Sequence, residues 1–142
     1  MRFVYRGRLA GRNKEINANR SHWAAGAKVK ADAQASIMWA IKAARLERVT
    51  EPVEVYIEWH EAPRRRDVDN IQSSTKYILD ALVTAGVLPN DNLTWVRQVY
   101  QKVVKDDEDY VVVELDRDGY EITRRHHGNI DKQGRTDNGD NR

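Results

Sequence analysis

Hydrophobic and polar positions follow two different periods along the chain, and together they predict the element order β-α-β-α-β-β. Alternation with a period of two over Phe3 to Leu9 is typical of a first strand. After a loop over residues 10–20, Ser21 is a candidate cap for an alanine-rich helix that we expect to reach residues 45–48. The three-to-four spacing that predicts this helix is made by Trp23, Ala27, Gln34, Ile37, Met38, Ile41 and Ala44.

The rest of the pattern predicts a strand, a second helix and two more strands. Pro52 precedes an alternating strand whose one face is formed by Val53, Val55, Ile57 and Trp59. The segment EAPRRRDVDN leads into a single helix that ends at Gly86. Its apolar side is formed by Thr75, Ile78, Leu79 and Leu82, and its polar side by Ser73, Lys76 and Asp80. Two strands then follow, over Thr94–Val104 and Tyr110–Leu115.

This order predicts an α+β fold with a small mixed, largely antiparallel sheet and two helices packed on it. We expect one domain over residues 1–118, and a polar, disordered tail over residues 119–142, where apolar residues almost vanish. Core packing is the expected use of most apolar residues in the first helix, with a subunit interface as the alternative. These residues are Trp23, Ile37, Met38 and Trp39.

Composition narrows the class of protein. The chain has 142 residues and no cysteine, so disulfides and thiolate metal sites are excluded. No apolar run is long enough for a membrane span and no signal peptide is visible, so the expected location is cytoplasmic, without membrane partners.

Charge is unevenly distributed along the chain. Residues 1–50 carry 11 Lys/Arg against 3 Asp/Glu, whereas residues 51–120 carry 8 against 15. A basic half suits a polyanion such as DNA, although a solvated surface explains it equally well. On the DNA reading, Arg20, Lys28 and Lys30 are predicted contacts.

Three carboxylates are the candidate chemical centre. Asp67 and Asp69 lie two residues apart before the second helix, and Asp91 lies in the turn after it. If the backbone at Asp67 and Asp69 is extended, both side chains point the same way. Carboxylates at loop ends suit Mg²⁺, which can orient a water and stabilise charge on a phosphate. The alternative is that these residues only cap the helix and form the turn.

Basic residues accompany these carboxylates. Arg64, Arg65 and Arg66 are candidate phosphate contacts, with a solvated charge run as the alternative. Lys76 and Asp80 form an i, i+4 pair that is either a surface ion pair or a phosphate-binding ammonium beside the carboxylates. Glu58 and Glu61 are further candidates for the acidic centre.

The string RRRDVDN, the Lys76–Asp80 spacing and the string ALVTAGVLPND resemble the central signature of the RusA family of Holliday junction resolvases. The resemblance covers residues 63–91. It implies a homodimer that needs Mg²⁺, with Mn²⁺ as a substitute and no small-molecule cofactor, and that makes paired nicks in four-way DNA junctions during recombination and repair. It also implies that Asp67, Asp69 and Asp91 bind the metal and catalyse cleavage, with Lys76 an essential basic residue. Compact resolvases of this type are often encoded by phages.

Two positions depart from that signature. Lys76 follows the D-x-D-N string by about one helical turn more than in the family pattern, because Gln72 to Thr75 lengthen the gap. Asn90 also stands where an acidic residue is common, which leaves Asp91 as the third carboxylate. Three activities stay open: junction resolution, metal-dependent cleavage of other branched DNA or of RNA, and branched-DNA binding without catalysis.

Overall fold

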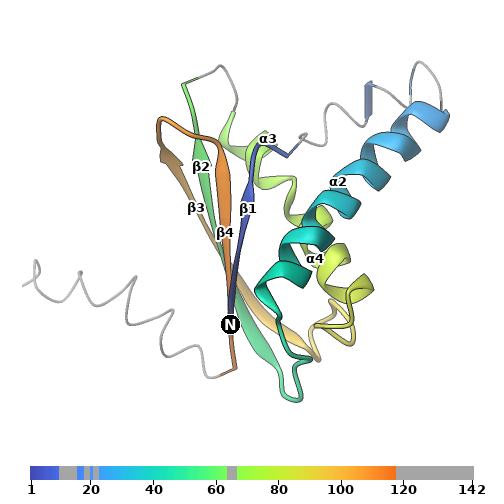
Figure 1. Ribbon diagram of the computed structural model, residues 1–142, viewed down its shortest axis with the longest axis vertical. Helices are drawn as coiled ribbons and strands as arrows, with labels where there is room; N and C mark the ends of the chain where they lie inside the picture. The colour runs from blue at the N-terminus through green and yellow to red at the C-terminus, as the bar shows by residue number, and fades with distance from the viewer. Residues whose placement is uncertain (10–15, 18–19, 21–22, 64–66, 118–142) are drawn as a thin grey trace, which may run out of the picture.

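The computed structural model of the protein contains a four-stranded mixed sheet with helices packed on one face (Figure 1). The structure describes residues 1–9, 16–17, 20, 23–63 and 67–117. The strands are β1 (Arg2–Arg6), β2 (Val53–Glu61), β3 (Val96–Lys105) and β4 (Tyr110–Asp116). The helices are α2 (Trp23–Ala44), α3 (Val68–Gln72) and α4 (Thr75–Thr84). The predicted α+β class and the order β-α-β-α-β-β are confirmed. The proposed tail, residues 119–142, and the predicted cap Ser21 lie outside the described residues.

The sheet has the strand order β1-β4-β2-β3. Strand β4 is antiparallel to both β1 and β2, whereas β2 and β3 are parallel. Parallel neighbours need a crossover connection, and α3 and α4 lie in the one between β2 and β3. Every motif residue from Asp67 to Asp91 therefore lies in this crossover.

Strand β2 supplies the centre of the core. The predicted inward face is confirmed, since Val53, Val55, Ile57 and Trp59 are each at most 2% exposed. They pack with Ile37 and Ile41 of α2 and with Ile78 and Leu82 of α4 in one hydrophobic cluster. Within the described residues, no helix is long and apolar enough to cross a membrane.

The first helix differs from the prediction on its outer face. Ile37 is buried and Met38 is partly buried as expected, but Trp23 and Trp39 are 77% and 75% exposed, so their assignment to the core is wrong. The buried line on α2 runs through Ala33, Ile37 and Ile41. Trp39 is two residues from Ile37, which is about 200° around a helix, so it faces away from the core.

The second helix is broken in two, although the pattern predicted one. Hydroxyl groups bond to the preceding turn at the break: Ser73 Oγ donates to the carbonyl of Asn70 at 2.6 Å, and Thr75 Oγ1 donates to that of Gln72 at 2.6 Å. Such bonds compete with helical backbone pairing. The apolar face of α4 is confirmed at Ile78 and Leu82, and Tyr77 and Ala81 are buried beside them.

Gly86 ends α4 as predicted. Its φ is +78°, its N–H donates to the carbonyl of Val83 at 3.0 Å, and the N–H of Val87 donates to that of Leu82 at 3.0 Å. This is the Schellman arrangement, in which a left-handed residue closes the helix. It turns the chain back along α4 toward Asp91.

We expect Gly86→Ala to lower the free energy of unfolding by about 1 kcal/mol, because alanine is strained at positive φ while no atom lies within 4 Å of a Cβ there. Urea unfolding measures the change. Gly86→Asn is the control, since asparagine tolerates the left-handed region and should cost less than alanine. Equal losses for both variants would contradict the backbone explanation.

Candidate metal and nucleic-acid site

The turn after α4 brings Asp91 to Lys76. Lys76 Nζ lies 3.5 Å from an Asp91 carboxylate oxygen and 2.8 Å from one of Asp80. The turn itself is held by its asparagines: the N–H of Asn92 donates to Asn90 Oδ1 at 3.0 Å, and the N–H of Thr94 donates to Asn92 Oδ1 at 3.1 Å. Side chains other than Asp91 therefore stabilise the turn, and its carboxylate is directed to Lys76.

Lys76 is held as a cation by two carboxylates. The hydrogen bond to Asp80 raises the pKa of Lys76 above its ordinary value, and Asp91 adds to this effect although partial burial opposes it. The side chain is 62% exposed, so its ammonium group is accessible to an anion. At neutral pH Lys76 therefore serves as a positive charge rather than as a base. Asp80 also contacts Lys30 of α2 at 3.9 Å, which links the two helices.

Asp67 and Asp69 lie at the start of α3, and both are exposed. Asp67 is the N-cap residue with an extended backbone, yet its side chain makes no capping hydrogen bond. Neither carboxylate has a hydrogen bond or ion pair within the described residues. The expectation of an extended backbone is met at Asp67 but is wrong at Asp69, which lies in the first turn of α3. The alternation argument for this pair therefore does not hold, since residues i and i+2 on a helix do not face each other.

The three predicted metal ligands do not form one compact group. Within residues 1–117, the masked positions aside, no three Asp, Glu, His or Cys side chains are placed to hold one ion. Lys76 contacts Asp91 but neither Asp67 nor Asp69, in keeping with the longer gap between the D-x-D-N string and the lysine. One atom beside Asp69 does lack a partner: Asn70 Oδ1 is buried without a hydrogen bond. A buried acceptor of this kind is costly unless a water or an ion satisfies it.

The predicted DNA-binding cations fall into three groups. Arg64, Arg65 and Arg66 lie outside the described residues. Arg20 is exposed. Lys28 and Lys30 are each paired with a carboxylate, Lys28 with Asp32 at 2.8 Å and Lys30 with Asp80 at 3.9 Å. The positive charge of each of these two lysines is thus partly balanced by a neighbouring carboxylate of the same chain.

A second charged cluster, which the sequence pattern did not reveal, lies around His60 on the sheet face away from the helices. His60 Nδ1 is 2.8 Å from an Asp106 oxygen, and His60 Nε2 is 2.6 Å from a Glu58 oxygen. Tyr56 donates to Glu58 at 2.7 Å, and the His60 and Tyr110 rings stack at 4.0 Å. A lone histidine on an alternating strand offers no signal for this, because Asp106 and Tyr110 reach it only through the pairing of β2 with β3 and β4.

This cluster includes Glu58, one of the two additional residues that were candidates for the acidic centre. Burial opposes the charge on Glu58, but hydrogen bonds from Tyr56 and His60 outweigh it and lower the Glu58 pKa. The bond from His60 likewise lowers the pKa of Asp106. Glu58 alternates with the inward Ile57 and Trp59, so it lies on the face opposite the helices. Glu61 is paired with Arg8 at 3.8 Å. The suggestion that Glu58 serves the acidic centre is therefore wrong.

We expect the stability that this cluster contributes to be lost in acid. Lowered carboxyl pKa values stabilise the fold above the ordinary pKa of about 4, and this contribution disappears as the pH falls through the lower folded values. His60→Phe keeps a ring to stack on Tyr110 but loses both hydrogen bonds. Urea unfolding between pH 7 and pH 2 should show a less stable variant with a shallower acid slope. A variant with the wild-type slope would contradict the assignment.

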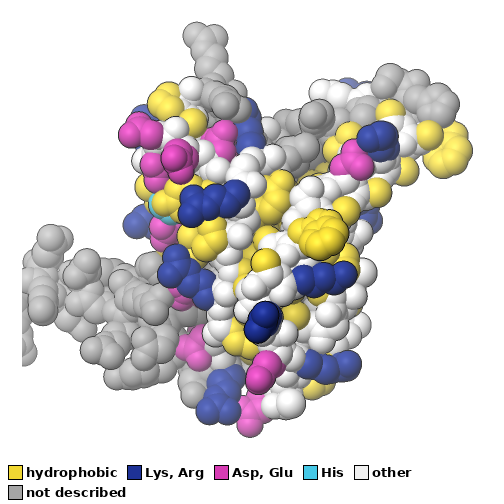
Figure 2. All heavy atoms as spheres, viewed as in Figure 1, with side chains coloured by type: hydrophobic (Ala, Val, Ile, Leu, Met, Phe, Trp, Pro, Cys, Tyr) yellow, Lys and Arg dark blue, Asp and Glu magenta, His cyan; other side chains and the backbone are white. Residues whose placement is uncertain are grey.

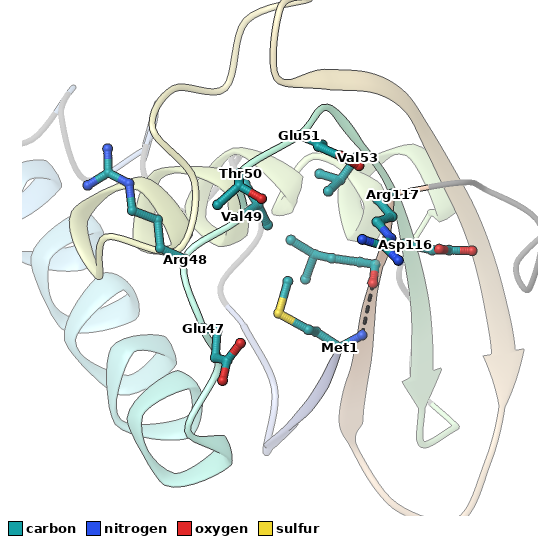
Figure 3. Close-up of a pocket in the computed structure, with 10 residues that line it drawn as sticks. Met1, Glu47, Arg48, Val49, Thr50, Glu51, Val53, Asp116 and Arg117 are labelled. Atoms are coloured by element: carbon teal, nitrogen blue, oxygen red, sulfur yellow. Dashed lines mark hydrogen bonds between the residues drawn. The ribbon is translucent and has the colours of Figure 1, made fainter.

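A separate hollow of about 300 Å³ lies at the other end of the sheet (Figure 3). It is lined by Met1, the segment Glu47–Glu51, Val53 and Leu115–Arg117, and the amino terminus closes one side by donating to the carbonyl of Leu115 at 2.9 Å. The Arg48 side chain points away from it. None of the predicted site residues lines this hollow, so it is unrelated to the acidic centre.

The chain matches no protein-family model and no curated protein.

Proposed function

We propose that the protein is a Mg²⁺-dependent endonuclease that acts on branched DNA, in the manner of the RusA-type resolvases that its motif resembles. The observation that carries this proposal is the contact between Lys76 and Asp91, 3.5 Å apart, which joins two distant parts of the motif. A simple turn residue would not need this contact, because Asn90 and Asn92 already hold the turn. A simple surface pair would need only Asp80, the i+4 partner of Lys76.

The residues of α3 fit a hard divalent cation. Mg²⁺ in proteins is often bound through one or two carboxylates while it keeps several waters, so it does not require three ligands in one cluster. Asp67 and Asp69 are the carboxylates available to such an ion: both are exposed at the start of α3 and have no partner within the described residues, although their side chains do not converge as they would on a strand. The buried Asn70 Oδ1 would accept a hydrogen bond from a water of that ion. When bound, Mg²⁺ would activate a water and stabilise charge on the phosphate.

Lys76 supplies the complementary charge. Its ammonium group stays protonated at neutral pH and is accessible, so it can bind a phosphate oxygen and stabilise the charge that develops there. Asp91 and Asp80 orient Lys76 from two sides. In this scheme the carboxylates at the start of α3 would bind Mg²⁺. Asp91 would instead act by orienting Lys76, the residue that it contacts in this structure.

Junction DNA and a homodimer are the substrate and assembly that the resemblance implies. A four-way junction has approximate two-fold symmetry, and two strands must be cut, so a C₂ dimer provides two matching sites. Other branched DNA, RNA, or binding without cleavage are the competing outcomes of the experiments below.

We expect purified protein with Mg²⁺ to make paired symmetric nicks in a labelled four-way junction, and EDTA to abolish them. Asp69→Asn should bind the junction but not cut it, because the neutral amide removes a cation ligand while preserving shape. Gel analysis of cut and uncut strands measures both steps. Cleavage of flaps or RNA in preference to junctions would change the substrate, and normal cutting by Asp69→Asn would remove the metal assignment.

We expect Lys76→Ala to lower the single-turnover cleavage rate by roughly 10²-fold, as the loss of one electrostatic stabiliser does in other enzymes. Asp91→Asn should lower it less, because Asp80 still holds Lys76. Asn70→Ala removes a buried acceptor that has no protein partner, so it should not lower the free energy of unfolding. A lysine variant that cuts at the wild-type rate would limit Lys76 to a surface ion pair.

A further inference from the structure

An exposed tryptophan lies on the outer face of α2. Trp39 is 75% exposed, although a tryptophan in the middle of a helix is usually an anchor of the core. Figure 2 shows Lys and Arg side chains among exposed hydrophobic groups on the face that carries α2. A large aromatic ring open to solvent among cations suits a partner that offers both flat rings and negative charge.

Two cations continue the line of Trp39 at helical spacing. Lys42 Nζ lies 5.9 Å from the centre of the Trp39 ring, and Arg45 follows three residues later at the end of the helix. We call Trp39, Lys42 and Arg45 the Trp39 stripe. Lys28 and Lys30 on the same helix have acidic partners, whereas Lys42 and Arg45 have no carboxylate partner within the described part of the chain. The positive charges of Lys42 and Arg45 are therefore available to an anionic partner.

The backbone at Arg45 adds to this picture. Its φ is +52°, the left-handed conformation that closes a helix and that glycine adopts without strain. Among the described residues Arg45 alone has a positive φ without being glycine. The chain thus carries a cation at a position where the backbone favours glycine, which is understandable if the charge has a use.

The Trp39 ring lies on the side of α2 away from its contact with α4. Lys30 contacts Asp80 of α4, and Trp39 is nine residues from Lys30, about half a turn around the helix. A base stacked on Trp39 is therefore not at the phosphate that Lys76 would hold in the same subunit.

We propose that the Trp39 stripe binds a single-stranded segment of DNA, with a base stacked on the Trp39 ring and its flanking phosphates on Lys42 and Arg45. Nucleotides supply a flat ring and a negative charge in every unit, and a base can stack on a side chain only where it is unpaired. The inference rests on the proposed function for its choice of DNA, and it adds a contact outside the cleavage site that would hold the opened strand of a branch.

The first test is the affinity of the full-length protein for a labelled oligodeoxythymidylate in EDTA, where no cleavage occurs. Trp39→Ala should weaken binding by roughly tenfold, the effect of losing one base–aromatic stack. Trp39→Phe should bind more tightly than the alanine variant but lose the quenching of tryptophan fluorescence. Trp23→Ala is the matched control, since Trp23 is 77% exposed on the same helix, and it should bind like wild type. Wild-type affinity in Trp39→Ala, or an equal loss in Trp23→Ala, overturns the proposal.

The second test is the salt dependence of the same binding. Lys42→Ala and Arg45→Gly should each reduce the slope of log affinity against log salt by about 0.7, the value for one phosphate contact on a single strand. Arg45→Gly should unfold at an equal or higher urea concentration than wild type, so weaker binding cannot be ascribed to a damaged fold. Lys105→Ala, an exposed cation on β3, is the control with an unchanged slope. Unchanged slopes in both stripe variants overturn the proposal.

The outcomes separate this inference from the proposed function. If Trp39→Ala weakens binding but the wild-type protein never cuts DNA, the stripe stands and the endonuclease assignment fails. If the protein cuts junctions and Trp39→Ala binds the oligonucleotide normally, only the stripe fails. Sedimentation of the free protein completes the test: a change of mass in Trp39→Ala with unchanged DNA binding would show a subunit contact and would also overturn the proposal.

Discussion

The parallel pairing of β2 with β3 is the constraint on which the rest of the structure depends. Two parallel neighbours cannot be joined by a hairpin, so the chain must cross over the sheet between them. The crossover contains α3, α4 and the turn at Asp91, and the buried residues of β2 and α4 hold it against the sheet. The described motif residues, from Asp67 to Asp91, are therefore confined to one connection, and Lys76 and Asp91 meet because that connection folds back on itself.

Charged side chains have different surroundings in the crossover, on the sheet face opposite the helices and on the outer face of α2. In the crossover, Lys76 lies between Asp80 and Asp91, so the cation is oriented yet open to solvent. On the sheet face opposite the helices, His60 lies between Glu58 and Asp106 and is largely enclosed, an arrangement suited to stability. On the outer face of α2, Lys42 lies over Trp39. The same residue types thus form a candidate reaction centre, a structural network and a candidate binding surface, according to burial and partners.

Much of the candidate site was predictable from spacing, but its geometry was not. The pattern correctly placed Lys76 and Asp80 on the polar side of a helix and Asp91 in the turn after it. It did not predict the break at Ser73–Ser74, because the hydroxyl bonds that compete with helical pairing there do not alter the pattern of hydrophobic and polar positions. It also put an extended backbone at Asp69, where the helix has already begun. Both errors concern local hydrogen bonds, to which hydrophobic periodicity is blind.

The sequence by itself determined the element order, the inward faces of β2 and α4 and the end of α4 at Gly86, because periodicity and backbone preference are local properties. Only the tertiary structure decided the rest. The pairing of the strands brings Asp106, the residue after β3, to His60 of β2. The fold of the crossover brings Asp91 to Lys76. Helix packing left Trp39 in solvent, since the core line through Ile37 and Ile41 faces the other way. These contacts join residues far apart in the chain, and their pairing depends on how whole elements pack.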